Sequence, residues 1–575
     1  MAHMTPTSPQ HSFLYHSSTE SLELARPPWC EWQYAARTSL QLDIKPREPA
    51  DLQSNPGASD RTTETPNLQL NRNSPLSSIF YSLEAILLSA AGKFNMTRDT
   101  PFRVIVIGAG VAGLSASHCL QRAGIDHVVI ERSTEVAPRH GASISFYPQG
   151  ARILSQMGCL DAMMESCVPC KYSLSRGPDG KPITKASFFD FVKENHGERI
   201  IILERRKFLQ NMYDCLPSKT PIQLGCEVAS VRQHTTGVTV TLKDGTVEEG
   251  DMIIGCDGVH SPTRSIMWDH ANKMQPGVIT AKEKTDMKTR WKCLVGMGPG
   301  TPELGERDMT AVFDKGISFL CITQPTETFW FVFFRLDKEF SWPKRNRYTA
   351  HDAEAAAASV ADHPVCESLV FGELWKRRDR ASMLDLEEGV LDHWFYDRIV
   401  LAGDCVHKVT PNIGFGGNMA LESVVVLCNH LQAMLAGQRG AKPSRATLNR
   451  AFAAYQEERR GRVVEVMELS SLITRMQAWD TPFHKFLATW VAPLQAERAV
   501  ADQLGEIIRK GPKIAYGSDT AEGFGSGGRL RWADEEEKKG VEKSSRLQWI
   551  ASVVTVLMIA MGVTQLGWLG SLLNI

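Results

Sequence analysis

The chain has 575 residues, which exceeds the usual size of a single domain, so we expect two domains or one elaborated domain with appendages. Its composition is ordinary for a folded protein, with 43% hydrophobic residues, 22% charged residues and a formal net charge of −1. Because a nucleic-acid-binding protein normally has a basic excess or a basic stripe, this balance excludes nucleic acid as an expected partner.

The thirteen cysteines are scattered through the chain. An odd count without regular spacing does not indicate a disulfide framework, so we expect reduced thiols in a compartment that faces the cytosol. Cys167 and Cys170 have CxxC spacing, but no second pair or histidine cluster completes a metal site. A structural role is expected for this pair, with redox activity as the alternative, and no metal is predicted.

Residues 1–97 are rich in Ser, Thr, Pro, Asn and Gln and are predicted to be a disordered N-terminal extension. Its one apolar patch, Ile79–Ala91, is too short to span a bilayer and lies too far from the N-terminus for a signal peptide. Met96 stands just before the first predicted strand, and a start there would give a compact enzyme. The extension is therefore interpreted either as a regulatory tail or as an artefact of gene modelling.

A strand, a glycine-rich turn and a helix follow one another at the start of the predicted folded body. Phe102–Ile107 (FRVIVI) is a short β-branched run typical of a buried parallel strand. The next residues match GxGxxG with Gly108, Gly110 and Gly113. The first glycine permits a tight turn, the second lets the backbone approach a pyrophosphate, and the third lets the helix pack on the strand. The pyrophosphate is expected at the N-terminus of a helix over Leu114–Ala123.

A second predicted strand, His127–Ile130, ends at Glu131, which follows Gly113 by 18 residues. A carboxylate at this strand end can accept hydrogen bonds from ribose hydroxyls, which favours a free 2′-OH and therefore FAD or NAD over NADP. The strand, glycines, helix, second strand and acid occur in the right order. Together they predict a Rossmann-type dinucleotide-binding unit.

Two later segments also end a predicted strand with a glycine and an aspartate. Asp251–Arg264 contains Asp257 in a DG pair, and Arg398–Asn418 contains Asp404 in a GD pair. Neither segment has GxGxxG in a complete strand, turn and helix, so a second independent dinucleotide fold is not expected.

The GxGxxG, DG and GD motifs, in this order, resemble those of group A flavin-dependent monooxygenases. The resemblance implies that Asp404 binds the ribityl chain of FAD and that the segment around Asp257 packs where FAD and NAD(P)H pass. Arg205, in LERRKFL, resembles the family's FAD-contacting arginine, and Ser145 is a further expected cofactor contact. One FAD held from both ends would explain both glycine clusters.

The glycine loop after Asp404 suits the flavin ring on chemical grounds as well. Reduced flavin carries negative charge, which free N–H groups at a helix N-terminus stabilise, and a helix is predicted directly after Gly417. Pro411 would stiffen the approach to the ring, while Gly414 and Gly416 remove side chains that would block it. His407 is expected to cap or pack rather than to act as a base.

Two further segments narrow the resemblance. His140–Gly158 and Thr474–Leu494, followed by a terminal apolar stretch, are similar to fungal epoxidases of meroterpenoid and indole-diterpene pathways. The resemblance implies epoxidation of an olefin on a farnesyl- or geranylgeranyl-type chain, with NADPH and O₂, through a flavin C4a-hydroperoxide. A separate terpene cyclase would then open the epoxide. Since an alkene needs no deprotonation, no dedicated general base is demanded.

The middle of the chain is predicted to supply the substrate side. Ala311–Ile322 and Thr328–Leu336 are expected to be sheet strands that cover the flavin. Their aromatic side chains suit a prenyl chain and core packing equally well. Lys292 and Phe313 lie near positions where the family often has Arg and Tyr, so they are the catalytic candidates. Because Phe lacks a hydroxyl, we expect these positions to shape the pocket.

The C-terminal part is predicted to be a polar linker over residues 501–546, with GFGSGG and DEEEKK runs, followed by a membrane anchor. Leu547–Ile575 has 29 residues without a charge, which predicts a transmembrane helix over 547–573. Tryptophans lie near both of its ends and four basic residues precede it: Trp549, Trp568, Lys538, Lys539, Lys543 and Arg546. This pattern predicts a catalytic body facing the cytosol, with the endoplasmic reticulum as the expected membrane. A buried hydrophobic helix is the alternative.

The predicted fold is α/β, with a Rossmann-type FAD-binding domain, an interleaved β-sheet substrate domain and the C-terminal transmembrane helix. The body is expected over 98–500, with FAD-binding parts at about 98–175, 200–275 and 380–440, substrate parts at about 176–199 and 276–379, and a helical tail at 441–500. The predicted partners are a prenylated small molecule and the membrane. Two alternatives stay open: an aromatic hydroxylase of the salicylate-hydroxylase type, and a non-oxygenating flavin oxidase or flavin-binding membrane protein.

Overall fold

The computed structural model describes residues 101–517 and 523–537, apart from residues 140 and 439. All of them belong to the compact unit Met96–Ile575. The predicted N-terminal extension up to residue 97 and the predicted transmembrane helix over 547–573 lie outside the described residues.

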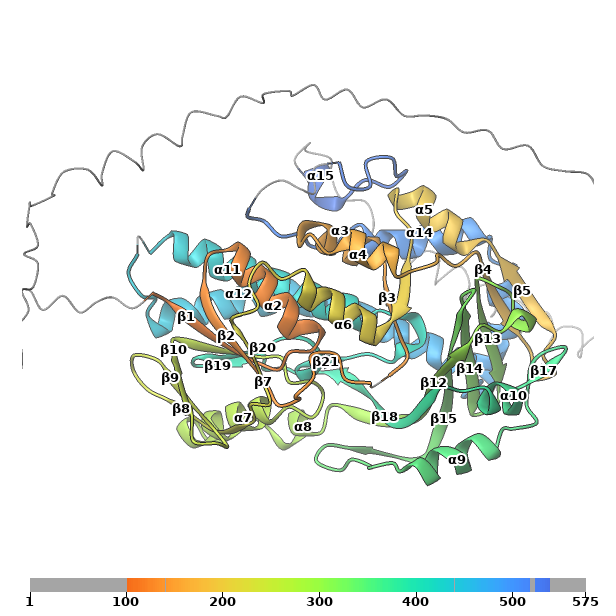
Figure 1. Ribbon diagram of the computed structural model, residues 1–575, viewed down its shortest axis with the longest axis horizontal. Helices are drawn as coiled ribbons and strands as arrows, with labels where there is room; N and C mark the ends of the chain where they lie inside the picture. The colour runs from red at the N-terminus through yellow and green to blue at the C-terminus, as the bar shows by residue number, and fades with distance from the viewer. Residues whose placement is uncertain (1–100, 140, 439, 518–522, 538–575) are drawn as a thin grey trace, which may run out of the picture. The chain divides into compact units, whose positions relative to one another are not determined.

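A six-stranded sheet forms the first half of the fold (Figure 1). In spatial order its strands are β19 (Phe395–Tyr396), β20 (Ile399–Leu401), β11 (Met252–Gly255), β1 (Arg103–Ile107), β2 (Asp126–Glu131) and β7 (Ile222–Leu224). All neighbours pair in parallel except β19 and β20. The central strand β1 is apolar because both faces of the sheet are covered, and its Val104, Ile105 and Val106 are fully buried. The Rossmann-type unit predicted from the GxGxxG segment is therefore present, with α2 (Val111–Arg122) between β1 and β2.

An eight-stranded, mostly antiparallel sheet lies beside the first one (Figure 1). In spatial order its strands are β21 (His407–Lys408), β18 (Arg380–Val390), β12 (Lys288–Pro299), β15 (Glu327–Ser341), β14 (Ile317–Thr323), β13 (Asp308–Asp314), β4 (Tyr172–Arg176) and β5 (Pro182–Ala186). Its central strands β12 and β15 are the longest, and they pair over almost their whole length.

Two sequence-based boundaries differ from this sheet. The range Ala311–Ile322, expected to be one strand, is the hairpin of β13 and β14, because Gly316 takes a positive φ of 75° that turns the chain back. Residues 380–390, assigned to the FAD-binding part, form β18 and pair with β12 in the substrate sheet. The chain thus crosses between the two domains later than its composition indicates.

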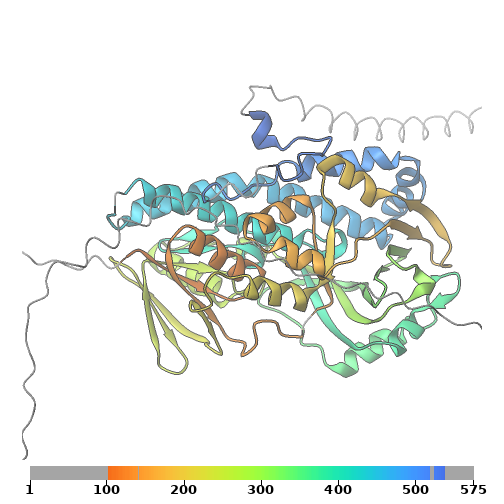
Figure 2. The same cartoon turned by 45° about the horizontal axis from the view of Figure 1, so that its top comes forward.

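The two helices α11 (Gly416–Ala436) and α12 (Arg445–Gln477) lie alongside each other and pack against the Rossmann-type unit (Figure 2). Glu422 of α11 is fully buried and pairs with Arg459 at 2.8 Å and Arg462 at 2.7 Å, so a charged cluster joins the two helices. Of the described helices, α11 alone has the length and hydropathy of a membrane span. Its burial and the charge of Glu422 identify α11 as a core helix instead.

The remaining elements cover the edges of the two sheets. The helices are α3 (Pro148–Gln156), α4 (Leu160–Glu165), α5 (Phe188–His196), α6 (Arg205–Asp214), α7 (Pro262–Met274), α8 (Ala281–Lys284), α9 (Ala350–Ala358), α10 (Phe371–Lys376), α13 (Pro482–Phe486), α14 (Glu497–Ile508) and α15 (Ala533–Glu537). Short helical turns are η1 (Pro302–Leu304), η2 (Gly403–Cys405), η3 (Pro411–Ile413), η4 (Leu487–Val491) and η5 (Ala492–Leu494). Small sheets contain β3 (Ser143–Phe146), β6 (Ile201–Glu204), β8 (Val228–Gln233), β9 (Val238–Leu242), β10 (Val247–Gly250), β16 (Pro364–Cys366) and β17 (Leu369–Val370).

The segment predicted to be a polar linker packs on the body wherever the structure describes it. Helix α14 lies against α5, and Trp532 is 3% exposed. The glycine-rich run fits closely because Gly525 and Gly528 leave no side chain between their backbone and that of His196. Asp534 forms a double ion pair with Arg152, with both N–O distances at 3.0 Å. The linker prediction is therefore wrong over residues 501–517 and 523–537, because the glycines permit close packing rather than flexibility.

Replacing Asp534 by Asn should destabilise the folded body. Arg152 is 2% exposed and stacks on Trp532 at 4.4 Å, so loss of the carboxylate leaves a buried guanidinium without its counter-charge. Because Asp534 is one third exposed, we expect a loss of about 2 kcal/mol in the free energy of unfolding, less than for a fully buried pair. Thermal unfolding measures this loss, and Asp362→Asn, at an exposed position, is the control.

The same variant has a defined pH dependence. Burial raises the pKa of Asp534, but Arg152 and Lys513 outweigh burial and lower it below its ordinary value. A carboxyl with a lowered pKa stabilises the folded state above its unfolded pKa, and this stabilisation disappears as the pH falls through the folded pKa. The difference in melting temperature between wild type and Asp534→Asn should therefore shrink below about pH 4. A difference that stays constant to pH 3 would contradict the ion pair.

Candidate flavin site

One large cavity extends from the GxGxxG turn to the eight-stranded sheet. Its volume is about 3980 Å³, well above the few hundred to about a thousand cubic ångströms of most small-molecule pockets. Ala109, Gly110 and Glu131 line one end, and the loop from Pro411 to Gly417 lines the middle. The cavity is therefore large enough for a dinucleotide together with a second molecule.

The three glycines of the first motif have three different surroundings. A Cβ on Gly113 would lie 1.7 Å from the Gly108 carbonyl oxygen, and Gly108 has a φ of 100° and contacts the Cys256 carbonyl. A Cβ on Gly110 would meet nothing within 4 Å, although Gly110 lines the cavity. Gly108 and Gly113 are thus required by packing inside the protein, whereas Gly110 faces open space. This is the pattern expected where a pyrophosphate approaches the backbone.

Glu131 lies at the end of β2 and lines the same end of the cavity. Its carboxylate accepts hydrogen bonds from the backbone N–H of Ala109 at 2.7 Å and of Ser133 at 2.8 Å. Each oxygen keeps a second lone pair, so the carboxylate can also accept from ribose hydroxyls. The structure therefore brings Glu131 to the GxGxxG turn, where the sequence predicts it.

A charged group lies between the two ends of the cavity. Lys408 forms an ion pair with Asp404. Both Lys408 and Arg205 line the cavity. Burial lowers the pKa of Lys408, but the charges of Asp404 and Glu387 outweigh burial and raise it. Burial lowers the pKa of Arg205, and the nearby charge of Asp404 opposes this. Asp404 itself is not among the residues that line the cavity, but it pairs with Lys408, which does line it, and its charge acts on Arg205 of the same wall.

The glycine loop from Pro411 to Gly417 is fixed by contacts from β3 and its neighbours. The Tyr147 hydroxyl donates to the Ile413 carbonyl at 2.9 Å, and the Ser145 hydroxyl donates to the Gly414 carbonyl at 3.2 Å. Gly414 has a φ of 67°, and a Cβ there would lie 2.0 Å from the Ser145 hydroxyl oxygen. A side chain at Gly414 is therefore excluded by both backbone conformation and space.

The other glycines of this loop begin helix α11. A Cβ on Gly417 would lie 2.9 Å from Ile144, whereas Gly416 has only Val409 at 4.0 Å. Both glycines line the cavity, and the free N–H groups of the first helical turn lie in the same segment. The loop can thus present backbone donors to an anionic ring, as the sequence predicts.

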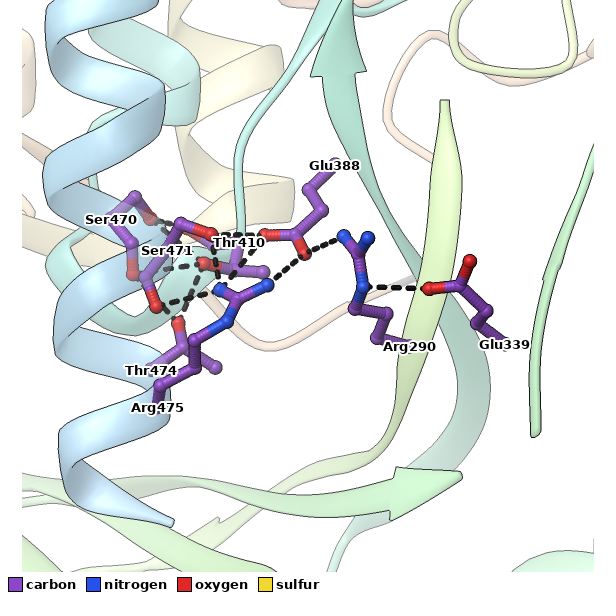
Figure 3. Close-up of polar contacts among 8 residues, drawn as sticks. All are labelled: Arg290, Glu339, Glu388, Thr410, Ser470, Ser471, Thr474 and Arg475. Carbon is purple, nitrogen blue, oxygen red and sulfur yellow. Dashed lines mark hydrogen bonds and ion pairs between the residues drawn. The ribbon is translucent and has the colours of Figure 1, made fainter. Parts of the chain in front are cut away.

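A buried hydroxyl cluster attaches this loop to helix α12 (Figure 3). Thr410, which precedes Pro411, has its hydroxyl 2.8 Å from that of Ser470 and 2.7 Å from that of Thr474. The Ser470 hydroxyl also donates to the Thr410 carbonyl at 2.9 Å. All three residues are 0–1% exposed. Since Ser470 and Thr474 are one helical turn apart, a single face of α12 holds the loop in place.

An ion-pair network continues from this cluster onto the substrate sheet (Figure 3). Arg475 of α12 pairs with Glu388 of β18 at 2.7 Å, and Glu388 also pairs with Arg290 of β12 at 2.8 Å. Arg290 reaches Glu339 of β15 at 2.9 Å. Burial raises the pKa of Glu388, but its two arginine partners and Ser471 outweigh burial and lower it. Helix α12 is therefore joined both to the flavin loop and to the sheet that forms the cavity floor.

Of the predicted site residues Asp257 and Phe313, the structure brings only Phe313 to the cavity. Asp257 is beneath the GxGxxG turn and not on the cavity wall, where its carboxylate accepts from Ser261 and from the Thr263 N–H at 2.9 Å. Its role is to cap α7, and burial raises its pKa. Phe313 lines the cavity, as predicted for a residue that shapes the pocket.

The prediction for Lys292 is wrong. Side chains alternate between the two faces of a strand, and Cys293 and Val295 of β12 line the cavity. Lys292 lies on the other face, 5.6 Å from the Phe334 ring. A register shift between Thr289 and Trp291 sets which face each residue of β12 takes.

His407 has the structural role that the sequence favours. Its ring nitrogen is 2.8 Å from the Ser423 hydroxyl, and burial lowers its pKa to about 3. A neutral, fully buried imidazole stabilises the contact between β21 and α11 and is not positioned as a base at the cavity.

Sequence reasoning missed several residues that fix the glycine loop: Tyr147, Lys408, Thr410, Asn418, Ser470 and Thr474. Three of them had a readable signal. Lys408 follows Asp404 by four residues, and Ser470 and Thr474 have helical spacing on an otherwise apolar face. The contacts of Tyr147 and Asn418 join segments about 270 residues apart, and no local pattern predicts them.

Gly110→Ala should weaken FAD binding, whereas Gly113→Ala should destabilise the apoprotein. In Gly110→Ala we expect the apoprotein to keep its melting temperature, because the new methyl group meets no protein atom, while the Kd for FAD rises about 10- to 100-fold. In Gly113→Ala the melting temperature of the apoprotein itself should fall, because the methyl group meets the Gly108 carbonyl. Differential scanning fluorimetry and calorimetric titration measure both values. Unchanged FAD affinity in Gly110→Ala would contradict the assignment of the pyrophosphate site.

Thr410→Val should loosen the glycine loop while the fold persists. Valine has nearly the shape of threonine but lacks the hydroxyl that joins Ser470 and Thr474, so the expected loss of stability is about 1 kcal/mol. Backbone amides of residues 411–417 should exchange faster in hydrogen–deuterium exchange, and the Kd for FAD should rise several-fold. Thr220→Val, at an exposed turn, is the matched control. Equal exchange in both variants would show that α12 does not fix the loop.

The FAD binding domain family matches residues 101–470 of the chain. The FAD-dependent monooxygenase DEP2 of Alternaria brassicicola is 40% identical over 436 residues, which cover 75% of this chain and 82% of that protein. The FAD-dependent monooxygenase atmM of Aspergillus flavus is 35% identical over 416 residues, 72% of this chain and 86% of that protein. The crystal structure of Klebsiella pneumoniae HpxO complexed with FAD and uric acid has a TM-score of 0.58 at 22% identity, over 72% of this chain and 97% of that one. That likeness shows the fold, whereas the family match and the fungal relatives show that the chain belongs to the FAD binding domain family and is an FAD-dependent monooxygenase.

Proposed function

We propose that this monooxygenase epoxidises an olefin of a prenyl chain on a meroterpenoid or indole-diterpene intermediate in fungal secondary metabolism, with NADPH as electron donor. The proposal rests on the chemistry of the cavity floor, and the fungal relatives named above support its coarser part, an FAD-dependent monooxygenase.

The observation that carries the proposal is an uncharged floor. The cavity-lining side chains of the five central strands of the eight-stranded sheet are all apolar or thiol: Cys293, Val295, Met309, Phe313, Leu320, Ile322, Phe331, Leu384 and Leu386. Opposite them, α12 contributes Leu469, Leu472, Ile473 and Met476. Such walls stabilise an extended hydrocarbon through burial of its surface, at about 25 cal/mol per Å².

An uncharged floor disfavours the aromatic-hydroxylase alternative. A small aromatic acid needs a cation for its carboxylate, and a phenol is activated by a base that removes its proton. No cavity-lining side chain of these five strands can do either, and the lysines that line the described cavity lie outside them: Lys185 of the edge strand β5, Lys408 and Lys510. An alkene needs neither group, so the demands on the chain are to exclude water and to orient the double bond.

The residues at the other end of the cavity fit FAD. The Gly108–Gly113 turn and Glu131 would hold its pyrophosphate and ribose, and Asp404 would hold the ribityl chain, leaving the ring beside the loop from Pro411 to Gly417. Bound there, FAD supplies the redox and oxygen chemistry of the reaction. NADPH is proposed as a transient visitor, because the described six-stranded sheet has a single GxGxxG turn.

The membrane and a downstream enzyme complete the proposal. Prenylated molecules partition into lipid, so a C-terminal anchor over 547–573, with the body in the cytosol at the endoplasmic reticulum, would concentrate enzyme and substrate together. A terpene cyclase is the proposed next enzyme, because an epoxide on a polyene opens readily under acid to start cyclisation.

The test compares prenylated and simple phenols as substrates of the purified full chain. With a farnesylated phenol and ¹⁸O₂, NADPH oxidation should accelerate at least tenfold, and the product should gain one ¹⁸O on the prenyl chain by mass spectrometry. Salicylate should give neither change. Hydroxylation of the aromatic ring would overturn the epoxidase proposal, and failure of NADPH to reduce the flavin in stopped flow would remove NADPH as the donor.

A paired substitution tests the cavity floor itself. Phe331→Leu should keep turnover of the farnesylated phenol within about threefold, because volume and polarity change little. Phe331→Asp should raise the KM at least tenfold, because a charge would be placed against hydrocarbon. If both variants retain wild-type KM values, the prenyl chain does not lie on this floor.

A further inference from the structure

The exposed apolar side chains of the described residues are concentrated on one segment. Nine large hydrophobic side chains are exposed, and six of them lie between residues 472 and 500: Leu472, Phe483, Phe486, Trp490, Leu494 and Val500. Trp490 is 68% exposed and Leu494 is 86% exposed. We call this segment, from the end of α12 through α13, η4 and η5 to the start of α14, the apolar lip.

The apolar lip is also a wall of the cavity. Leu472, Phe483 and Val500 are exposed to solvent and line the cavity at the same time. Between them, Leu487, Ala488 and Val491 line the cavity from η4, while Trp490 does not line it and is exposed. One face of the lip therefore borders the cavity and the other faces outward, which is the arrangement of an entrance.

The middle of the lip has the charge expected of a segment at a lipid surface, whereas the carboxylates Asp480 and Glu497 lie toward its two ends. From Pro482 to Leu494 the sequence PFHKFLATWVAPL contains no carboxylate, and its ionisable residues are His484 and Lys485. A segment with exposed Trp and Phe beside a basic residue matches the composition of helices that lie in the interface of a bilayer, where anionic headgroups attract the positive charge.

If the anchor proposed above over residues 547–573 crosses a bilayer, the length of chain before it allows the lip to reach that surface. Leu547, which begins the 29 uncharged residues, follows Glu537 by ten residues, so the two are separated by at most about 36 Å. Glu536 pairs with Arg509 at 2.8 Å, and Arg509 directly follows α14 (Glu497–Ile508). Helix α14 is about 18 Å long and Leu494 lies just before it, so the maximum reach of these ten residues exceeds the length of that helix.

We propose that the apolar lip inserts shallowly into the cytosolic face of the bilayer, so that the cavity opens to lipid and the apolar substrate enters from the membrane without crossing water. The proposal deepens the proposed function, on whose prenylated substrate it rests. A second copy of the chain would also cover the lip, but it would close the cavity entrance, and the test distinguishes this case.

The first measurement needs no turnover. The full chain is bound to vesicles of phosphatidylcholine and phosphatidylserine at 4:1, with and without phosphatidylcholine brominated near the top of its acyl chain. Bromine quenches only tryptophans within the bilayer, and the quenching that disappears in Trp490→Phe belongs to Trp490. We expect part of the bromine quenching to come from Trp490. Leu494→Glu should reduce this part several-fold. Met274→Glu is the matched control, because Met274 is 59% exposed on α7.

Quenching that is unchanged in Trp490→Phe would overturn the proposal, whether the lip faces water or is covered by a second copy.

A second measurement tests whether the lip is the substrate entrance. In Leu494→Glu the KM for farnesylated phenol dissolved in the vesicles should rise at least fivefold, while the KM for the same compound in detergent micelles should not change. If Trp490 is quenched but the farnesylated phenol is not turned over, membrane insertion of the lip stands and the proposed substrate is wrong. If the substrate is turned over and Leu494→Glu changes the KM equally in vesicles and in micelles, the lip is not the substrate entrance.

Discussion

Gly403 packs between the two helices that frame the flavin site, α2 and α11. Its φ is 80°, and a Cβ there would lie 3.2 Å from Ala112 of α2 and 3.5 Å from Ala420 of α11. Helix α2 begins at the GxGxxG turn, and α11 begins at the glycine loop. A side chain at Gly403 would be strained by the positive φ and would press on Ala112, so glycine allows the two helices to begin near one ligand, with their free N–H groups and positive ends toward it. Asp404 is the next residue in the chain and pairs with Lys408 of the cavity wall.

The rest of the site depends on how α11 is supported. Glu422 is buried with two arginines of α12, and removal of either kind of charge would leave the other uncompensated in the core. The same helix α12 fixes the flavin loop through Thr410 and supplies the apolar side chains opposite the sheet. The flavin side and the substrate side of the cavity therefore share one rigid element. A change in the position of α12 would alter both sides together.

Local sequence rules predict the GxGxxG end of the site. They fail for parts of the substrate sheet and for the glycine-rich run near the C-terminus. The positions of Gly108, Gly110 and Gly113 follow from sterics within one strand, turn and helix, and the structure brings Glu131 to the same turn, as the sequence predicts. That this turn holds a pyrophosphate stays a prediction. The face taken by Lys292 depends on a register shift two residues earlier, which no composition reveals. The run GFGSGG has the composition of a linker, yet Gly525 and Gly528 fit against a backbone more than 300 residues away in the chain. Contacts between segments so far apart in the chain depend on tertiary packing, which local sequence patterns do not reveal.

The central claim is that one FAD spans the cavity from the GxGxxG turn to the glycine loop. Calorimetric titration of the apoprotein with FAD, ADP and riboflavin tests it most directly, because ADP matches one end of FAD and riboflavin matches the other. The account predicts one FAD per chain, displacement of both ADP and riboflavin by FAD, and simultaneous binding of ADP and riboflavin. Binding of ADP to a chain already saturated with FAD would show a separate nucleotide site at Gly108–Gly113 and would contradict the account.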